Sequence, residues 1–310
     1  MLIQILVPCY NEEEVLPTTV PRLLHVLADV QSRHPGVRGE VVLVDDGSTD
    51  GTWPLIAALS RSHAAVHGLK LAHNAGHQNA LLAGLDASRA CADAVITIDA
   101  DLQDDEGAIP EMVGRFLSGD DIVYGVRRER TTDTWFKRKS AELFYRFMRA
   151  MGGDVLYNHA DFRLMSRRAV QALLCYPERN LFLRGMVWGI GLPHSTVLYD
   201  RHRRLAGESK YPLRRMMSFA LDGLTSFSVR PLRLIVVLGL LFILIALGAI
   251  VYGLVSFAMG EALPGWTSLL VSVWFIGGAI LTAMGIIGEY IGKIYKEVKR
   301  RPRYFVEKKI

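Results

Sequence analysis

The stretch VITIDADLQDDE, residues 95–106, reads as a short buried strand that runs directly into a group of carboxylates. Val95 and Ile96 are typical of a strand core, whereas Asp99 and Asp101 follow with a single residue between them. Two carboxylates at one strand end make each other harder to ionise, so such a pair calls for a positive charge nearby. The stretch therefore predicts a strand whose end holds a cation.

The residues before this stretch alternate between strand and helix patterns. IQILVPCYN (3–11) and GEVVLVDDGSTDGT (39–52) are apolar runs that end in polar residues, and a helical pattern lies between them at about 13–32. GLKLAHNAGHQNALLAGLDAS (68–88) adds a third strand, a turn and a helix. Strands that alternate with helices predict an α/β fold, with a mostly parallel, Rossmann-like sheet flanked by helices.

Three polar clusters, at 8–12, 45–50 and 99–104, each follow one of these strands. In open parallel sheets, ligands bind outside the carboxyl ends of the strands. Taken singly, the first two clusters fit a turn or a helix cap equally well, because their residue types favour both. Their coincidence at one edge of the sheet favours a binding site.

The residue types at 99–103 indicate which ligand to expect. Asp99, Asp101 and Gln103 offer hard oxygen ligands, which suit Mg²⁺ or Mn²⁺ bound together with a phosphate-bearing ligand. The sequence contains neither the glycine-rich loop of P-loop NTPases nor that of Rossmann dehydrogenases. We therefore expect a metal and phosphate site of another kind.

The C-terminal part of the 310-residue chain has a different composition. Uncharged apolar runs at 234–260 and 262–288 are each long enough to cross the roughly 30 Å hydrocarbon core of a bilayer as a helix. They predict a transmembrane hairpin with spans at about 234–258 and 266–288. Basic residues flank the hairpin and are absent from its connecting loop, so the positive-inside rule predicts that both termini are cytoplasmic.

These patterns predict four parts. Residues 1–210 form a cytoplasmic catalytic domain without a secretory signal, and residues 211–230 form an amphipathic helix in the membrane interface. Residues 231–290 hold the hairpin. Residues 291–310 form a basic juxtamembrane segment that begins with a second amphipathic helix, and much of the net charge of +5 lies at these membrane-flanking ends. No nucleic-acid partner is expected.

Several motifs together resemble a known family. ILVPCYNEEE, VVLVDDGSTDGT, NAGHQNALLAGL and ITIDADLQDD are similar to the successive motifs of family 2 glycosyltransferases, which have the GT-A fold. ADFRLMSRRAV, PERNLFLRGMVWGIG and RLAGESKYPLRRM resemble the polyprenyl-phosphate glycosyltransferases within that family. The chain looks most like GtrB-type bactoprenol glucosyltransferases and is also similar to dolichol-phosphate mannose synthases and ArnC.

The resemblance implies roles for individual residues. The nucleotide would be held by Pro8, Tyr10, Asn11, Glu12, Asp45, Asp46, Ser48 and Asp99, and the metal by Asp99, Asp101 and Gln103. The catalytic residues would be Asp101, Arg127 and Asp161. The acceptor phosphate needs cations, which we assign to Arg127, Arg138, Lys139, Arg204 and Lys210.

Two positions keep alternative interpretations. Asp161 either orients a sugar hydroxyl or acts as a base, or it only pairs with Arg163 within the fold. His77 stands where many relatives have Lys, which leaves its contact with the nucleotide base open.

The expected function is inverting transfer of one sugar from a nucleotide-sugar donor to polyprenyl (undecaprenyl) phosphate, for cell-envelope glycosylation. UDP-glucose is the favoured donor, followed by donors of N-acetylglucosamine, mannose or aminoarabinose. The alternative is a non-catalytic, membrane-anchored module that binds nucleotide sugar. The resemblance further implies Mg²⁺ or Mn²⁺ as cofactor, a multi-pass inner-membrane location and a homotetramer.

Overall fold

The computed structural model describes residues 1–128, 159–200, 230–259 and 265–310. The chain divides into two compact units. The described residues of the sheet unit are 1–128, 159–200 and 301–310, and those of the helical unit are 230–259 and 265–300. Residues 211–229 of the interfacial helix predicted at 211–230 lie outside the described residues, as do Arg138, Lys139, Arg204 and Lys210.

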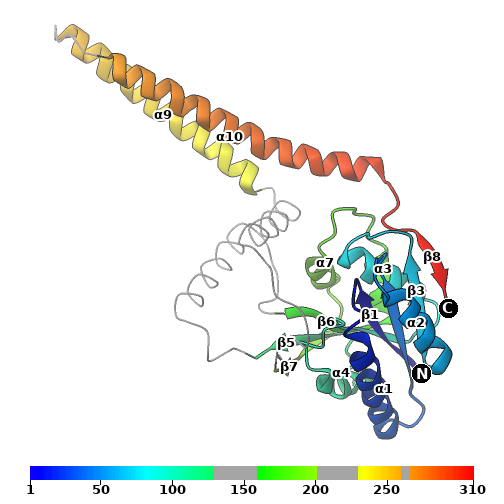
Figure 1. The fold of residues 1–310 in the computed structure, drawn as a ribbon. Coiled ribbons are helices and arrows are strands. Elements are labelled where there is room, and N and C mark those ends of the chain that lie inside the picture. The colour runs from blue at the N-terminus through cyan, green and yellow to red at the C-terminus, as the bar shows by residue number, and fades with distance from the viewer. Residues whose placement is uncertain (129–158, 201–229, 260–264) are drawn as a thin grey trace. The chain divides into compact units, whose positions relative to one another are not determined.

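The sheet unit contains one eight-stranded sheet with the order β7-β5-β6-β4-β1-β2-β3-β8 (Figure 1). The strands are β1 (Leu2–Cys9), β2 (Arg38–Asp45), β3 (Val66–Leu71), β4 (Ala94–Thr97), β5 (Ile122–Arg127), β6 (His159–Ser166), β7 (His194–Tyr199) and β8 (Val306–Lys309). β6 and β8 run antiparallel to their neighbours, and the other neighbouring strands pair in parallel. The predicted mostly parallel α/β sheet is confirmed.

Helices cover both faces of the sheet. They are α1 (Leu16–Arg33), α2 (Thr52–Ser62), α3 (His77–Ser88), α4 (Ile109–Leu117), which follows the short 3₁₀ helix η1 (Glu106–Ala108), α6 (Arg167–Leu174) and α7 (Leu183–Gly189). The buried side chains of α1, α2 and α4 belong to one hydrophobic cluster, and those of α3, α6 and α7 belong to a second one. Two clusters separated by a sheet form the three-layer arrangement that a parallel sheet requires.

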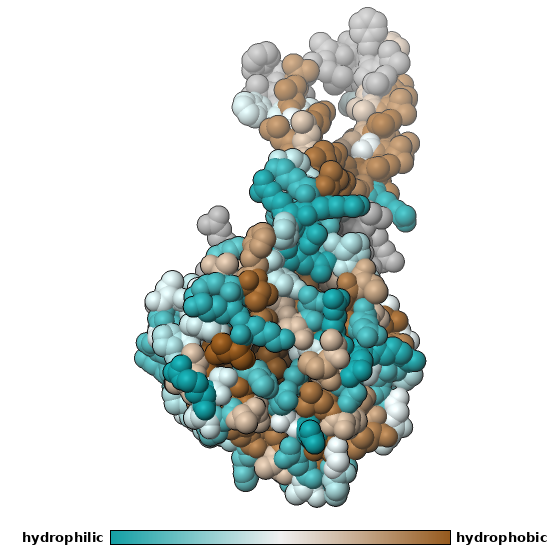
Figure 2. All heavy atoms as spheres, turned by 90° about the vertical axis from the view of Figure 1, so that its right-hand side faces the viewer, coloured by the Kyte–Doolittle hydropathy of each residue, from teal (hydrophilic) through white to brown (hydrophobic). Residues whose placement is uncertain are grey.

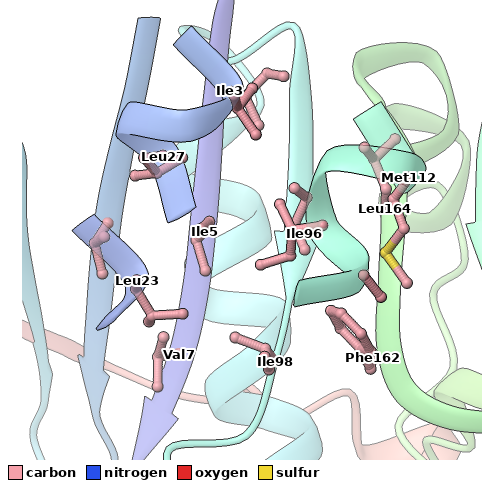
Figure 3. Close-up of a cluster of buried hydrophobic side chains, with 14 of the residues drawn as sticks. Ile3, Ile5, Val7, Leu23, Leu27, Ile96, Ile98, Met112, Phe162 and Leu164 are labelled. Carbon is pink, nitrogen blue, oxygen red and sulfur yellow. The ribbon is translucent and has the colours of Figure 1, made fainter. Parts of the chain in front are cut away.

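The strand β1 shows how the sequence builds this arrangement. Ile3, Ile5 and Val7 point into the first cluster, whereas Leu6 between them points into the second. This alternation follows from the period of two in a strand, and burial of both faces explains why β1 is apolar almost throughout. Figure 3 shows Leu23 and Leu27 of α1 packed over the first face.

The C-terminal residues add a strand that the sequence did not predict. β8 pairs antiparallel with β3, and Gly68 exchanges two backbone hydrogen bonds with Ile310, of 3.0 and 2.9 Å. Lys70 forms an ion pair with Glu307 at 2.9 Å. A β-carbon at Gly68 would approach the side chains of Ile56 and Ile310 to 2.7 and 2.9 Å, so the glycine leaves room for both. Part of the predicted basic segment 291–310 therefore completes the sheet.

The helical unit consists of α9 (Arg230–Ala258) and α10 (Trp266–Lys299). Both are long and apolar enough to cross a membrane, with mean hydropathies of 2.8 over 232–249 and 1.5 over 272–299. Figure 2 shows mainly hydrophobic surface on these helices, and Phe242 of α9 contacts Phe275 of α10 edge to face. The sequence predicted a separate amphipathic helix from residue 291, but α10 continues without a break through 291–299. The helix ends at Lys299, and Arg300 follows in a left-handed conformation, shortly before Pro302.

Candidate active site

Four loops meet at the carboxyl ends of β1, β2, β3 and β4. The first two of these loops hold each other in place. The backbone N–H of Asn11 donates to Ser48 Oγ at 3.0 Å, and that of Glu12 donates to Thr52 Oγ1 at 2.8 Å. The Asn11 side chain in turn accepts a bond from the N–H of Thr49 at 2.9 Å. Asn11, Glu12 and Ser48 are thus brought together, while Pro8 is buried and Tyr10 is exposed beside them.

Asp45 and Asp46 are adjacent in sequence but have different surroundings. Asp46 accepts the backbone N–H groups of Ala75 and Gly76, at 2.7 and 3.0 Å, so it fixes the loop that precedes α3. Asp45 accepts the N–H of Ser48 on Oδ1 at 3.1 Å, while its buried Oδ2 has no hydrogen-bond partner among the described residues. A buried carboxylate oxygen without a donor is costly, so Asp45 is suited to accept a bond from a ligand.

Asp99 is the exposed carboxyl at the centre of these loops, with 44% of its side chain accessible. Partial burial and the nearby carboxylates of Asp161, Asp104 and Asp101 raise its pKa to about 6, although His77 opposes this shift. A divalent cation would reverse this shift. Asp101 and Gln103 lie on the same loop, where the Gln103 N–H donates to Asp101 Oδ1 at 3.2 Å.

The described residues contain no group of three or more His, Cys, Asp or Glu side chains arranged around a metal position. One or two carboxylates are nevertheless enough for Mg²⁺ when the substrate phosphates supply the remaining ligands. Asp99 and Asp101 are the carboxylates predicted for this role. The loop is also held in an uncommon conformation, because the buried Leu102 has a φ of 45°.

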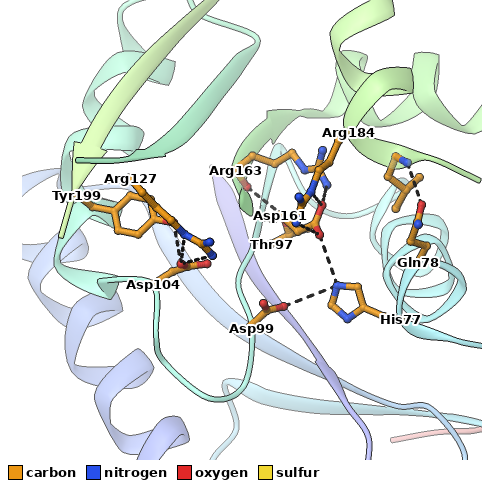
Figure 4. A network of polar contacts seen from close by, with 11 residues as sticks. His77, Gln78, Thr97, Asp99, Asp104, Arg127, Asp161, Arg163, Arg184 and Tyr199 are labelled. Carbon is orange, nitrogen blue, oxygen red and sulfur yellow. Dashed lines mark hydrogen bonds and ion pairs between the residues drawn. The ribbon is translucent and has the colours of Figure 1, made fainter. Parts of the chain in front are cut away.

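Asp161 and Asp99 both lie next to His77 (Figure 4). His77 Nε2 is 3.7 Å from Asp99 Oδ1 and 3.8 Å from Asp161 Oδ2. Two arginines bind Asp161: Arg163 Nη2 donates at 2.7 Å, and Arg184 forms a fork with Nε at 3.3 Å and Nη2 at 3.1 Å. We call Asp161, Arg163 and Arg184 the Asp161 cluster.

The two arginines bear on the interpretations of Asp161, whose role toward the sugar stays a prediction. Burial alone would raise the pKa of Asp161, but Arg163 and Arg184 lower it well below its usual range. A carboxylate that binds protons so weakly is a poor general base at neutral pH. The predicted pairing with Arg163 is present, and Arg184 is a second partner that the sequence analysis did not identify.

Arg127 lies in a separate network, which we call the Asp104 cluster (Figure 4). Its Nη2 donates to Asp104 Oδ1 at 3.0 Å, and its Nε donates to the Tyr199 hydroxyl at 3.1 Å. That hydroxyl donates to the same Asp104 oxygen at 2.7 Å. Asp104 is only 2% exposed, and Arg127 is 27% exposed. The role of Arg127 toward the acceptor stays a prediction, and a phosphate would have to share it with Asp104.

Residues 4–174 match the model of glycosyl transferase family 2. Over 99% of its length the chain is 49% identical to the uncharacterized glycosyltransferase YkoT of Bacillus subtilis (strain 168), of which it covers 91%. It is 40% identical, again over 99% of its length, to the SfII prophage-derived bactoprenol glucosyl transferase of Shigella flexneri, of which it covers 98%.

One similar solved structure is that of the mannosyltransferase PcManGT from Pyrobaculum calidifontis, in complex with GDP-Man and Mn²⁺. The two sequences are 16% identical, and the match covers 95% of this chain and 84% of that one, with a TM-score of 0.47. The family model and the full-length relatives define the class: the chain is a glycosyltransferase of family 2, with the GT-A type of sheet. Within that family it belongs to the GtrB-type group indicated by its motifs.

Proposed function

We propose that this glycosyltransferase transfers one glucose from UDP-glucose to a polyprenyl phosphate, with inversion at the anomeric carbon, and that it requires Mg²⁺ or Mn²⁺. The observation that carries the proposal is the Asp99 carboxyl, which is 44% exposed and has the carboxylates of Asp101, Asp104 and Asp161 as neighbours. The relatives named bactoprenol glucosyl transferase support the choice of sugar and acceptor.

The donor would lie across the loops after β1, β2 and β4. Asp45 Oδ2 would accept a hydrogen bond from the nucleoside, and the exposed Tyr10 offers a ring surface to the base. Asp99 and Asp101 would hold the metal, with Gln103 beside them. When bound, the metal neutralises charge on the departing nucleoside diphosphate.

The acceptor needs positioning rather than activation. A phosphate monoester carries a charge of about −1.5 to −2 near neutral pH, because its second pKa is about 6. One of its oxygens forms the new bond to the anomeric carbon as the bond to the diphosphate breaks, and no proton has to be removed from that oxygen. The weak proton affinity of Asp161 agrees with such a reaction.

We further propose that α9 and α10 span the cytoplasmic membrane, that the catalytic domain and the C-terminal segment are cytoplasmic, and that the chain forms a homotetramer. The pairing of β8 with β3 supports a common side for the catalytic domain and the C-terminal segment, because residues before α9 and after α10 share one sheet. An even number of crossings satisfies this condition. A reporter fused after Ile310 that is accessible only from outside the cell would contradict the cytoplasmic location of the C-terminal segment.

The test uses the purified full-length chain with undecaprenyl phosphate, Mn²⁺ or Mg²⁺, and radiolabelled UDP-glucose, UDP-N-acetylglucosamine, GDP-mannose or a UDP-aminopentose in parallel. We expect label from UDP-glucose in the lipid fraction and none in the presence of excess chelator. Transfer from another donor alone would change the assigned sugar. The absence of transfer from every donor would contradict a polyprenyl-phosphate acceptor.

A further inference from the structure

The Asp161 cluster contains more positive than negative charge. Arg163 is 1% exposed and donates to Asp161, so this pair is neutral by itself. Arg184 is 42% exposed and binds the same carboxylate as a second cation. The cluster therefore carries a net charge of +1 at a partly exposed position, which favours an anion there.

The geometry of Arg184 leaves hydrogen-bond donors for such an anion. A guanidinium has five N–H donors, and the fork to Asp161 uses one on Nε and one on Nη2. No hydrogen bond of Nη1 occurs within the described ranges 1–128, 159–200, 230–259 and 265–310. Three N–H groups at the far end of the fork thus remain for two oxygens of a phosphate.

The fold also holds Arg184 at the transfer site. Gln78 Oε1, on α3, accepts the backbone N–H of Leu183 at 2.9 Å and so anchors the start of α7, where Arg184 follows. His77, the neighbour of Gln78, reaches both Asp99 and Asp161. Arg184 therefore lies behind Asp161, and His77 contacts both Asp161 and the proposed metal ligand Asp99 (Figure 4).

The other arginines in this part of the described chain are less available. Arg127 is bound to Asp104 and Tyr199, and Arg163 is almost fully buried. We infer that Arg184 binds the phosphate of the polyprenyl acceptor and that Asp161 is its positioning residue. This inference rests on the proposed function and deepens it, because it names the group that recognises the second anionic substrate.

The test separates the two sources of phosphate, donor and acceptor. Full-length protein in detergent is titrated calorimetrically with UDP in the presence of Mn²⁺, and the UDP-loaded protein is then titrated with farnesyl phosphate. For Arg184→Ala we expect affinity for farnesyl phosphate, and the KM for undecaprenyl phosphate, to worsen roughly ten- to a hundredfold, while UDP affinity stays unchanged. Arg184→Lys should recover only part of the loss, because an ammonium cannot form the planar fork.

The matched control is Arg168→Ala. Arg168 also pairs with an aspartate, Asp121, but it is the second residue of α6, next to Arg167 and the N-cap Ser166, and Ser166 lies opposite Ala94 at the amino end of β4. This control should match wild type in both titrations. Because Asp161 keeps Arg163, the Arg184→Ala protein should also fold, and a thermal melt checks this.

Unchanged binding of farnesyl phosphate by Arg184→Ala overturns the inference, and so does an equal loss of UDP affinity, which would assign Arg184 to the donor. In both cases wild-type transfer to undecaprenyl phosphate leaves the proposed function intact. A wild-type chain that neither binds farnesyl phosphate nor transfers sugar to undecaprenyl phosphate overturns both.

Discussion

The Asp104 cluster and the Asp161 cluster contain similar residue types and balance their charges differently. Asp104 is nearly inaccessible and shares its oxygen between one arginine, which is 27% exposed, and one tyrosine hydroxyl, which gives a neutral group whose carboxylate is closed to solvent. Asp161 has two arginines, one of them 42% exposed, which gives a positive group open to a ligand. The two carboxylates differ in the number of arginines that bind them among the described residues, two on Asp161 and one on Asp104, so only Asp161 keeps a cation when its exposed arginine binds elsewhere.

The largest effect should come from the metal ligands that lie near both clusters. Asp101→Asn should reduce turnover by at least about two decades, because it weakens the hold on the metal. A Lewis acid contributes several kcal/mol at the transition state. Initial transfer rates with saturating Mn²⁺ measure this, and a thermal melt shows whether the protein is folded. Full activity of this variant, or of wild type in excess chelator, would contradict metal dependence.

The second largest effect tests whether Arg127 serves mainly to neutralise the buried Asp104 carboxylate. Arg127→Ala leaves the buried Asp104 carboxylate without its cation, which should lower stability by about 3 kcal/mol, or about 6–12 °C in Tm. Arg184→Ala should change Tm far less, because Asp161 keeps Arg163.

The double variant Asp104→Leu with Arg127→Met is the control for this pair. Replacement of both partners by apolar groups should recover most of the lost Tm. A stable Arg127→Ala protein with a raised KM for polyprenyl phosphate would show instead that Arg127 is available to the acceptor, as the sequence analysis predicted.

A third prediction concerns pH. Arg163 and Arg184 hold the pKa of Asp161 in the folded protein below the value of about 3.9 expected in the unfolded chain. Their contribution to stability is therefore complete above pH 4 and is lost as the pH falls toward the folded pKa. Asp161→Asn should cost about 2 kcal/mol at pH 7, and the difference from wild type should shrink below pH 4. A difference in Tm that stays constant between pH 7 and pH 3 would contradict this.

The smallest effect should come from the Tyr199 hydroxyl. Tyr199→Phe removes one hydrogen bond to Asp104 and one from Arg127, but it leaves the ion pair in place. We expect a loss of about 1–2 kcal/mol in stability and little change in acceptor KM. A large rise in KM would mean that the closed cluster also takes part in binding the acceptor.

Most of the fold could be predicted because β1 to β4 are recognisable from their own sequences. Each is an apolar run, and polar residues follow at its carboxyl end. β8 could not be predicted in this way, since VEKK contains a single apolar residue and its pairing depends on the open edge of β3.

For the site, the sequence indicated Asp99, Asp101 and Asp161 but not their partners. β6 inserts antiparallel between β4 and β5, and this register sets Arg163 opposite Thr97 and so places Asp161 near Asp99. Arg184 lies on α7, and the residues around it in the sequence do not indicate that it binds Asp161. Pairings between strands and helices that are distant in the chain depend on tertiary packing, which local patterns do not encode.

The position of β8 in the chain has a consequence for biosynthesis. Translation proceeds from the N-terminus, so β3 is made before α9 and α10, whereas its edge partner β8 is made after both. The edge of β3 therefore stays unpaired while the two apolar helices are synthesised, and unpaired edges promote aggregation. A molecule interrupted within either helix keeps this edge exposed, and the sheet closes only in a chain whose membrane anchor has been made in full.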